Sequence, residues 1–251
     1  MTASFTDVAA TIRNLASLRS RLDCSDDALM EMYWRFHPRF RFVKTSPWRA
    51  SLLDLGAGSG GLAQWGRWGA PVRDDIAFYG VDINLGEHSK HYRAWETLDL
   101  DAARPEFRGV TFDACVLSHV IEHVRDPARV LGWIGEHSRP GTLLYCEWPG
   151  MASLHQPSRD ALLAYGIDIM ITNFFDDASH VGPVSQADLI GWLAAAGFSV
   201  VEAGTIDLGL IGEEMLVRGL KDGDGFKKLC GFWSTTRWAE WLIACFDARR
   251  D

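Results

Sequence analysis

The chain has 251 residues, of which 47% are hydrophobic and 23% are charged, with a net charge of −8. This composition is sufficient for one substantial core and excludes a fibrous or wholly disordered chain. The acidic balance argues against a broad electropositive surface for DNA or RNA. We therefore expect no nucleic-acid partner.

Five cysteines are scattered along the chain without a Cys-x-x-Cys pair. An odd, scattered set of this kind predicts reduced thiols in a cytoplasmic protein. The first residues lack a basic region followed by an apolar run, and no stretch approaches the roughly 18 apolar residues of a membrane span. We expect a soluble, cytoplasmic protein without a membrane span.

Residues 5–35 predict two helices, because apolar residues recur at helical spacing and Ser25 precedes two acidic residues, as in a helix start. Residues 35–44 alternate aromatic and cationic side chains. We interpret them as an amphipathic connection with Phe40 and Phe42 inward and Arg39 and Arg41 in solvent. A surface for a phosphate-bearing or glycan substrate is the alternative.

Residues 51–61 combine a short apolar strand with a glycine-rich turn and the start of a helix. Glycine reaches backbone angles closed to other residues and lets a ligand lie against the main chain. The following helix points free N–H groups into the turn. The pattern predicts a cradle for a nucleotide-type cofactor, and a tight turn without a ligand is the alternative.

Two cofactor classes fit the glycines. The G-x-G-x-x-G spacing is shared with dinucleotide-binding domains. The run from Asp54 to Gly60, D-L-G-A-G-S-G, resembles the first motif of class I S-adenosylmethionine-dependent methyltransferases. That resemblance implies that Asp54 helps to place the amino-acid end of the cofactor, beside a turn made of Gly56, Ala57, Gly58 and Gly60.

The next two predicted strands also end in acidic residues. Residues 61–69 predict the first crossover helix, and residues 77–83 a strand whose Asp82 can accept hydrogen bonds from both ribose hydroxyls, with Ile83 against the adenine. Residues 97–101 predict a third strand. There the resemblance implies that Asp99, or Asp101 as second choice, contacts the adenine amino group beside Leu100.

Residues 112–118 predict a fourth strand, which ends at Ser118 in the cofactor site. The sequence H-V-I-E-H-V follows, and then Asp126-Pro127 begins a helix that runs to His137. This pattern resembles the ubiquinone-pathway and small-molecule branch of the methyltransferases. It implies methyl transfer rather than hydride transfer.

The remaining elements complete the expected fold. We predict a turn and fifth strand over 139–146, a substrate-covering insertion over 149–182, a helix over 185–196, a strand over 198–203, a last antiparallel strand over 214–220 and a helical tail over 226–249. The expected fold class is α/β, with a Rossmann-like seven-stranded methyltransferase sheet and helices on both faces. An N-terminal helical cap and an insertion after the fifth strand complete it.

The expected organisation is a single methyltransferase domain over residues 1–251. Residues 1–49 would form the helical cap and connection, and residues 50–148 the cofactor-binding core. The insertion over 149–182 would cover the substrate, and residues 183–251 would supply the C-terminal part of the core and a terminal helix.

Histidines are the candidate bases. Methyl transfer is an in-line displacement that depends on alignment, and a hydroxyl acceptor must also lose a proton, which histidine can accept near neutral pH. His119 is the first candidate because it directly follows the fourth strand. His123, His180 and His155 come next in that order, and a structural role is the alternative for each.

His119, Glu122 and His123 also spell the H-x-x-E-H signature of inverted zinc proteases. Within a methyltransferase sequence, a divalent ion that assists methyl transfer is the more reasonable metal hypothesis. The resembling ubiquinone O-methyltransferases have Glu, Glu and His at the matching positions. Because His119 replaces the first glutamate, we assign no residue firmly to a metal.

The sequence therefore predicts a methyltransferase that uses S-adenosylmethionine, releases S-adenosylhomocysteine and methylates oxygen in a small molecule or glycan. Metal-assisted O-methyl transfer and N-methyl transfer are the first alternatives. An NAD(P)-dependent oxidoreductase and a non-catalytic cofactor-binding subunit come behind them. A homodimer is left open.

Overall fold

The computed structural model describes residues 8–247, which fold into two compact units. The sheet unit consists of Pro38–Trp148, Val184–Gly204 and the residues from Trp241 on, and the helical unit consists of the residues up to His37, Pro149–Pro183 and Thr205–Glu240. The expected insertion over 149–182 coincides with the middle segment of the helical unit. A single domain over residues 1–251 stays a prediction.

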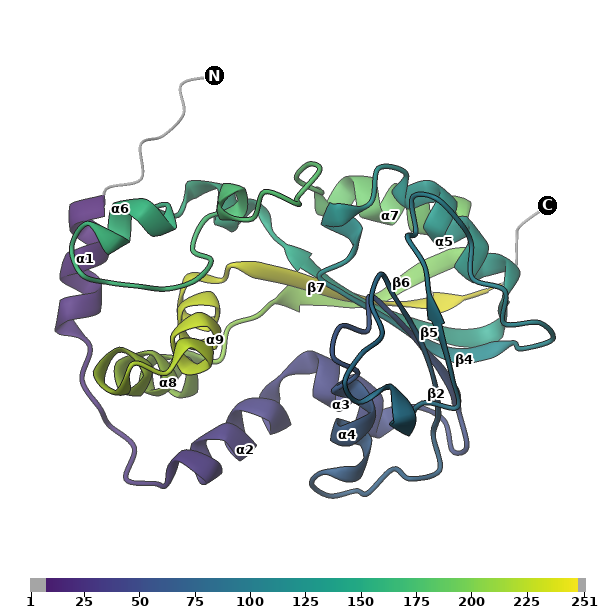
Figure 1. Cartoon of the computed structure of the whole chain (residues 1–251), viewed down its shortest axis with the longest axis horizontal. Helices are drawn as coiled ribbons and strands as arrows, with labels where there is room; N and C mark the ends of the chain where they lie inside the picture. Colours follow the sequence, from purple (N-terminus) through teal and green to yellow (C-terminus); the bar gives the residue numbers. More distant parts are fainter. Residues whose placement is uncertain (1–7, 248–251) are drawn as a thin grey trace. The chain divides into compact units, whose positions relative to one another are not determined.

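The seven strands form one sheet in the order β3-β2-β1-β4-β5-β7-β6. Figure 1 labels β2, β4, β5, β6 and β7 of this sheet. Strands β1 to β5 pair in parallel. Strands β6 and β7 run antiparallel to each other, because Asp247 N donates to Gly197 O and Ile206 N donates to Ala239 O. The bounds are β1 Ser51–Leu55, β2 Ala77–Asp82, β3 Ala94–Thr97, β4 Phe112–Ser118, β5 Ser138–Pro149, β6 Phe198–Thr205 and β7 Ala239–Phe246.

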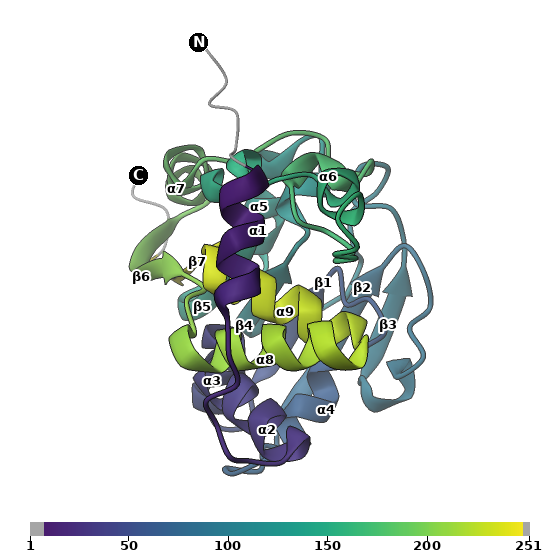
Figure 2. The same ribbon diagram turned by 90° about the vertical axis from the view of Figure 1, so that its left-hand side faces the viewer.

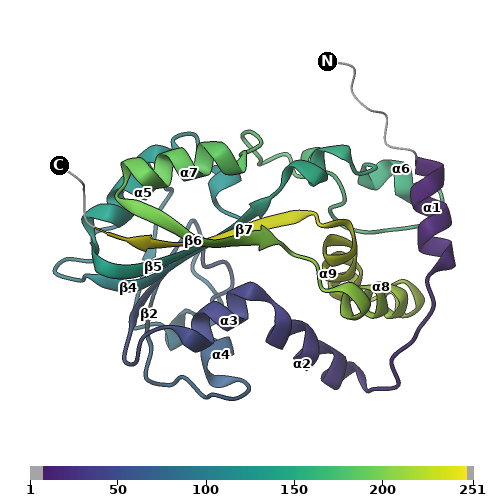
Figure 3. The ribbon, with the colours of Figure 1, turned by 180° about the vertical axis from the view of Figure 1, so that it is seen from behind.

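In the sheet unit, helices cover both faces of the sheet, with α5 and α7 on one side and α3 and α4 on the other (Figure 3). The Rossmann-like, seven-stranded fold class is therefore confirmed. The helices are α1 Val8–Ser17, α2 Asp26–Phe36, α3 Pro38–Thr45, α4 Leu62–Arg67, α5 Pro127–Glu136, α6 Arg159–Leu163, α7 Gln186–Ala195, α8 Gly209–Asp222 and α9 Gly225–Thr236.

At three of the predicted helix starts, the N-cap side chain accepts a backbone hydrogen bond. Ser25 accepts from Ala28 N, Asp126 from Arg129 N and Ser185 from Asp188 N. These bonds satisfy N–H groups that a helix cannot pair internally. The predicted helices at α2, α5 and α7 are confirmed. Residues 5–7 of the first expected helix lie outside the described residues.

Three predicted elements differ in the structure. Residues 214–220 lie inside α8 and not in a strand, because their buried positions Met215, Leu216 and Gly219 follow helical spacing. The expected tail helix stops at Thr236, and β7 follows as the last strand, whose buried side chains mostly alternate with partly exposed ones. The third strand is β3, which ends at residue 97, where the predicted strand was to begin.

The core of the sheet unit is built from the inner strands, whose residues are buried on both faces. Lys44 of α3 is also buried, and its ammonium donates to four backbone carbonyls at 2.7–3.0 Å, those of Gly66, Trp68, Gly69 and Pro71. These carbonyls lie at and just beyond the C-terminal end of α4. A single cation thus stabilises the end of the helix that follows the glycine turn.

The helical unit is organised on the pair α8 and α9, which pack side by side (Figure 2). Glycines allow this close approach, since a Cβ at Gly212 would lie 2.7 Å from Ser234 Cβ and one at Gly231 would lie 2.4 Å from Leu216 N. Its apolar cluster joins α2 to this pair through Leu29, Tyr33, Met215 and Cys230. Among residues 8–247, no helix has both the length and the apolar character needed to cross a bilayer.

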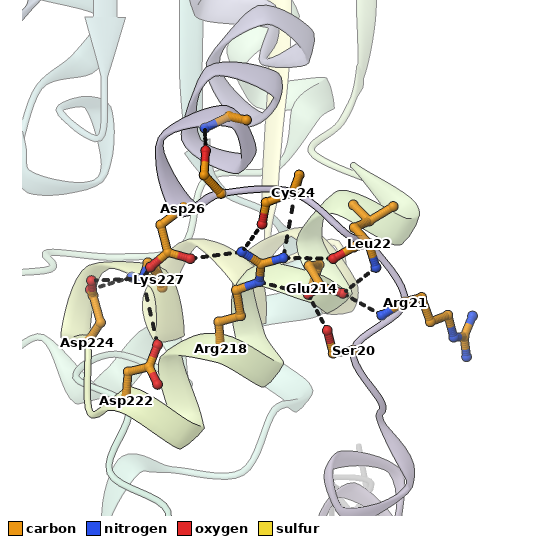
Figure 4. Close-up of polar contacts among 12 residues, drawn as sticks. Ser20, Arg21, Leu22, Cys24, Asp26, Glu214, Arg218, Asp222, Asp224 and Lys227 are labelled. Carbon is orange, nitrogen blue, oxygen red and sulfur yellow. Dashed lines mark hydrogen bonds and ion pairs between the residues drawn. The ribbon is translucent and has the colours of Figure 1, made fainter.

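An ionic network around the buried Glu214 ties the segment before α2 to α8 and α9 (Figure 4). Glu214 accepts from Ser20 Oγ at 2.6 Å, from the backbone N–H groups of Arg21 and Leu22, and from Arg218 Nε at 2.8 Å. Arg218 also donates to the carbonyl oxygens of Leu22 and Cys24.

Burial alone would raise the pKa of Glu214. The hydrogen bonds from Ser20, Arg21 and Arg218 outweigh burial and lower this pKa to about 2. On the other side of Arg218, Asp26 accepts from both Arg218 and Lys227. Charge-assisted bonds therefore hold the segment, and its Leu22 and Cys24 also pack against the apolar cluster.

We predict that Glu214→Gln lowers the free energy of unfolding by about 3 kcal/mol, because it leaves Arg218 without its buried counter-charge. Urea unfolding at pH 7 measures the effect. Because folding lowers the pKa of Glu214, its contribution is present above pH 4.5 and is lost as the pH falls toward 2. The wild-type and variant stabilities should therefore converge in acid.

The matched control is Glu213→Gln. Glu213 pairs with Arg21 at 3.5 Å, and both side chains are partly exposed. Its loss should cost under about 1 kcal/mol. Equal effects of the two substitutions would contradict the role given to Glu214.

Candidate functional site

The glycine turn after β1 is bound to the end of β2. The backbone N–H groups of Gly56 and Ala57 donate to Val81 O at 2.8 and 3.0 Å. Gly56, Gly58 and Gly60 all have positive φ, at 69°, 55° and 81°. A Cβ at Gly56 would lie 2.2 Å from a Val120 methyl group, whereas one at Gly58 would meet nothing within 4 Å. Gly56 is thus required by packing, and Gly58 borders open space.

A pocket of about 270 Å³ opens beside this turn, at the carboxyl ends of β1 and β4. This is the edge at which parallel α/β sheets bind ligands. Five of the predicted cofactor residues line the pocket: Asp54 at the end of β1, Ser118 at the end of β4, and Gly56, Ala57 and Gly58 in the turn. The lining residues are Arg39, Asp54, Gly56, Ala57, Gly58, Ser59, Gly61, Leu62, Trp65, Val116 and Ser118.

Asp54 is a buried acid at the end of β1, with 5% of its surface exposed. Its Oδ2 accepts a hydrogen bond of 2.6 Å from the Tyr92 hydroxyl. Burial raises the pKa of Asp54 to about 7, although the Tyr92 bond and the charge of Arg39 oppose this rise. Near neutral pH this carboxyl can therefore gain or lose a proton.

Asp82 holds the turn from the neighbouring strand. Its Oδ2 accepts from Gly58 N at 2.8 Å and its Oδ1 accepts from Asn84 N at 3.1 Å. Ile83 directly after it is 67% exposed. The structure thus brings Asp54, Asp82, Ser118 and the glycine turn to one edge of the sheet, as predicted. Gly60 belongs to the same turn but does not line the pocket.

Asp99 and Leu100 lie in the turn after β3. Asp99 Oδ1 accepts from Asp101 N at 2.8 Å, and Asp101 Oδ1 accepts from Arg125 N at 2.9 Å. Leu100 O accepts from the Arg129 guanidinium. These bonds hold the turn against the residues around the start of α5. Contact of Asp99 or Leu100 with an adenine stays a prediction.

Arg39 corrects the sequence interpretation, which placed it in solvent. Its guanidinium donates to Ser118 Oγ, lies 5.0 Å from the Trp65 ring and comes within 3.9 Å of Glu147 Oε2. The alternating pattern suggested that Arg39 and Arg41 share a face. Residues two apart on a helix such as α3 point in different directions, so only Arg41 is exposed.

His119 is clamped between two buried carboxylates. Its Nδ1 lies 3.3 Å from Glu122 Oε1 and its Nε2 lies 3.0 Å from Glu147 Oε1. Burial alone would lower the pKa of His119, but the hydrogen bonds and charges of Glu122 and Glu147 raise it to about 9. The ring is therefore an imidazolium at neutral pH. In that form neither nitrogen can accept a proton or bind a metal.

Glu147 is the residue of this cluster that sequence reasoning missed. It lies at the carboxyl end of β5 and also accepts from the Tyr145 hydroxyl at 2.5 Å. The sequence could have indicated Glu147 through its position near the end of a strand, which it shares with Asp54 and Asp82. His119 itself has φ +55°. A non-glycine residue in this region stores strain of the kind that often marks functional sites.

The other candidate histidines lie in different surroundings. His123 ends a 3-10 turn in the sheet unit, Ile121–His123. His180 and His155 belong to the helical unit. There His180 Nδ1 lies 2.6 Å from Phe174 O, and His155 is exposed in the 3-10 turn Met151–His155. Catalytic roles for these residues stay predictions.

A family model described as a methyltransferase domain matches residues 30–203. The chain belongs to the class I S-adenosylmethionine-dependent methyltransferases. This methyltransferase therefore uses S-adenosylmethionine as its cofactor, as predicted. No protein of curated function matches the chain.

Solved structures share the fold at low identity. A putative sarcosine dimethylglycine methyltransferase from Galdieria sulphuraria has a TM-score of 0.55 and 10% identity, with 96% of this chain and 98% of that chain covered. A chain of the complex between the Haloferax volcanii Trm112 methyltransferase activator and the putative methyltransferase has a TM-score of 0.54 and 16% identity, with 90% of this chain and 94% of that chain covered. A SAM-dependent methyltransferase from Archaeoglobus fulgidus has a TM-score of 0.52 and 19% identity, with 86% of this chain and 94% of that chain covered.

We predict different outcomes for alanine at two glycines of the turn. Gly58→Ala should lower the free energy of unfolding by about 1–2 kcal/mol, because only positive φ opposes the methyl group. Gly56→Ala should cost about 3 kcal/mol or more, since its Cβ would overlap Val120. Urea unfolding without ligand distinguishes the two. A Gly58→Ala variant at least as destabilised as Gly56→Ala would contradict the turn geometry.

Proposed function

We propose that S-adenosylmethionine binds in the pocket of the sheet unit, with its amino-acid end beside Asp54 and its ribose beside Asp82. The turn supports this placement, because Gly58 leaves its pocket side open and both acids stand at strand ends. Arg39 supplies a cation suited to the cofactor's carboxylate. Ile83, Asp99 and Leu100 are proposed to surround the adenine. When bound, the cofactor supplies an electrophilic methyl group.

We propose that the acceptor is an oxygen of a small molecule or glycan. The segment Pro149–Pro183 supports a small organic acceptor, because it exposes large apolar side chains that a bound molecule could cover. These are Met151, Leu163, Tyr165, Met170, Phe175 and Val181. A cytoplasmic location also stays part of the proposal, supported by five free cysteines. A homodimer stays a prediction.

We propose His119 as the base that takes the acceptor's proton. The observation that carries this proposal is the position of His119, which has a strained backbone and directly follows pocket residue Ser118. Only the neutral imidazole can accept a proton. Because the pKa of His119 is about 9, the neutral form of its ring increases with pH and becomes the major form only above that pH. The acidic limb of the rate profile is therefore expected near pH 9 rather than near 6.5.

The cofactor placement predicts that Asp82→Ala weakens S-adenosylhomocysteine binding about ten- to a hundred-fold, because an acceptor for charge-assisted bonds is lost. Titration calorimetry measures the affinity. Asp74→Ala is the matched control, since Asp74 is an exposed acid on the connection before β2. Unchanged affinity in a folded Asp82 variant would contradict the ribose role.

The base proposal predicts that His119→Ala lowers turnover by about 10²–10⁴-fold with little change in cofactor affinity. Acceptors are first screened by the mass of the methylated product. Glu147→Gln should move the acidic limb of the wild-type pH profile to lower pH, because it removes one carboxylate that holds the proton on His119. His137→Ala is the control, because that ring is bound to Trp133 O at the other end of the sheet.

Three results would favour another mechanism. Full activity of His119→Ala would exclude His119 as an essential base and favour His123 or His180. Wild-type activity that disappears with a chelator and returns with a divalent ion would favour metal-assisted transfer. A product methylated on nitrogen would replace the oxygen acceptor.

A further inference from the structure

Tyr92 is buried against the glycine turn although it belongs to the loop between β2 and β3. It directly follows the 3-10 turn Ser89–His91. Its hydroxyl donates to Asp54 Oδ2 at 2.6 Å, and 8% of its surface is exposed. Among residues 8–247, Tyr92 is thus the only side chain that donates a hydrogen bond to the buried Asp54 carboxyl.

The ring of Tyr92 is fixed by its neighbours. It packs edge-on against Trp95 at 5.1 Å and Phe78 at 5.8 Å between ring centroids. Two glycines leave room for it, since a Cβ would lie 3.2 Å from its Cε2 at Gly60 and 3.0 Å from its Cδ1 at Gly80. The hydroxyl therefore reaches Asp54 from a rigid support rather than from a mobile loop.

Three groups face the Asp54 carboxyl from different elements. Tyr92 donates a hydrogen bond, Arg39 of α3 contributes positive charge and Asp82 at the end of β2 contributes negative charge. Burial disfavours the ionised carboxylate more strongly than these neighbours favour it. The Tyr92 bond is thus a main force keeping the charged form accessible near neutral pH.

We propose that Tyr92 is a positioning residue that orients and stabilises the Asp54 carboxylate, so that binding of the cofactor's amino-acid end is coupled to release of one proton. This inference rests on the proposed placement of that end at Asp54. The protonated acid gives its proton to solvent, and the resulting carboxylate pairs with the ammonium group of the ligand. No other bond forms or breaks.

The coupling has a definite sign. Below pH 7, where Asp54 carries a proton in the free protein, affinity should fall about tenfold for each pH unit. Above pH 7 affinity should level off. Tyr92→Phe removes a hydrogen bond to the charged form, so the midpoint should move upward by about one pH unit. At pH 7 the variant should bind several-fold more weakly, and at pH 8.5 it should approach the wild type.

The experiment is titration calorimetry of the full chain with S-adenosylhomocysteine from pH 5.5 to 8.5. A second titration uses 5′-methylthioadenosine, which has the adenosine and sulfur but no amino-acid end. Its affinity should show neither the pH dependence nor the Tyr92→Phe effect. Tyr79→Phe is the matched control, since Tyr79 is also buried beside β1 and packs on Phe107 and Phe112.

A loss in Tyr92→Phe that is equal at every pH would overturn the proposal and leave Tyr92 a purely structural residue. Wild-type affinity for S-adenosylhomocysteine that is constant across this range would overturn it too. If the variant does not fold, wild-type titrations in two buffers of different ionisation enthalpy count the released protons, and a value near zero at pH 6 would refute the coupling. Failure of both ligands to bind at any pH would instead contradict the proposed cofactor site.

Discussion

The turn between β1 and α4 is the constraint on which the cofactor site depends. Its backbone must reverse direction while donating two hydrogen bonds to Val81 O and one to Asp82. Only glycine tolerates both the positive φ and the contact with Val120 at Gly56. Because these bonds join the ends of β1 and β2, the turn fixes the two acids and the pocket beside it as one unit.

The charges at this edge of the sheet balance one another. His119 lies between Glu122 and Glu147, and Arg39 lies near Glu147 and Ser118. Buried charges are costly unless they are paired, so each side chain depends on the ionisation of its neighbours. Burial raises the pKa of Asp54, whereas the two carboxylates beside His119 raise the pKa of that ring, so both groups are displaced toward the protonated form. Methyl transfer and cofactor binding should consequently depend on pH through different groups.

The helical unit uses charge for a structural purpose. Glu214 and Arg218 satisfy the backbone of the segment before α2, whose Leu22 and Cys24 also pack against the apolar cluster. The sequence does not reveal this network, because Ser20 and Arg21 lie 194 and 193 positions before Glu214. Local patterns could identify α2 through its Ser25 cap, but they could not indicate what holds the preceding segment.

The sequence by itself determined the features that depend on local geometry. The glycine spacing, the acids at strand ends and the cap residues predicted the turn, the cofactor class and most elements, because each signal acts over a few residues. The tertiary structure decided which side chains meet. In the structure, Arg39 lines the pocket instead of facing solvent, and residues 214–220 lie in α8 instead of a strand. His119 lies between two carboxylates. Long-range pairing set the surroundings of Arg39 and His119, and the spacing of neighbouring residues does not encode it, whereas the buried positions of α8 do follow helical spacing.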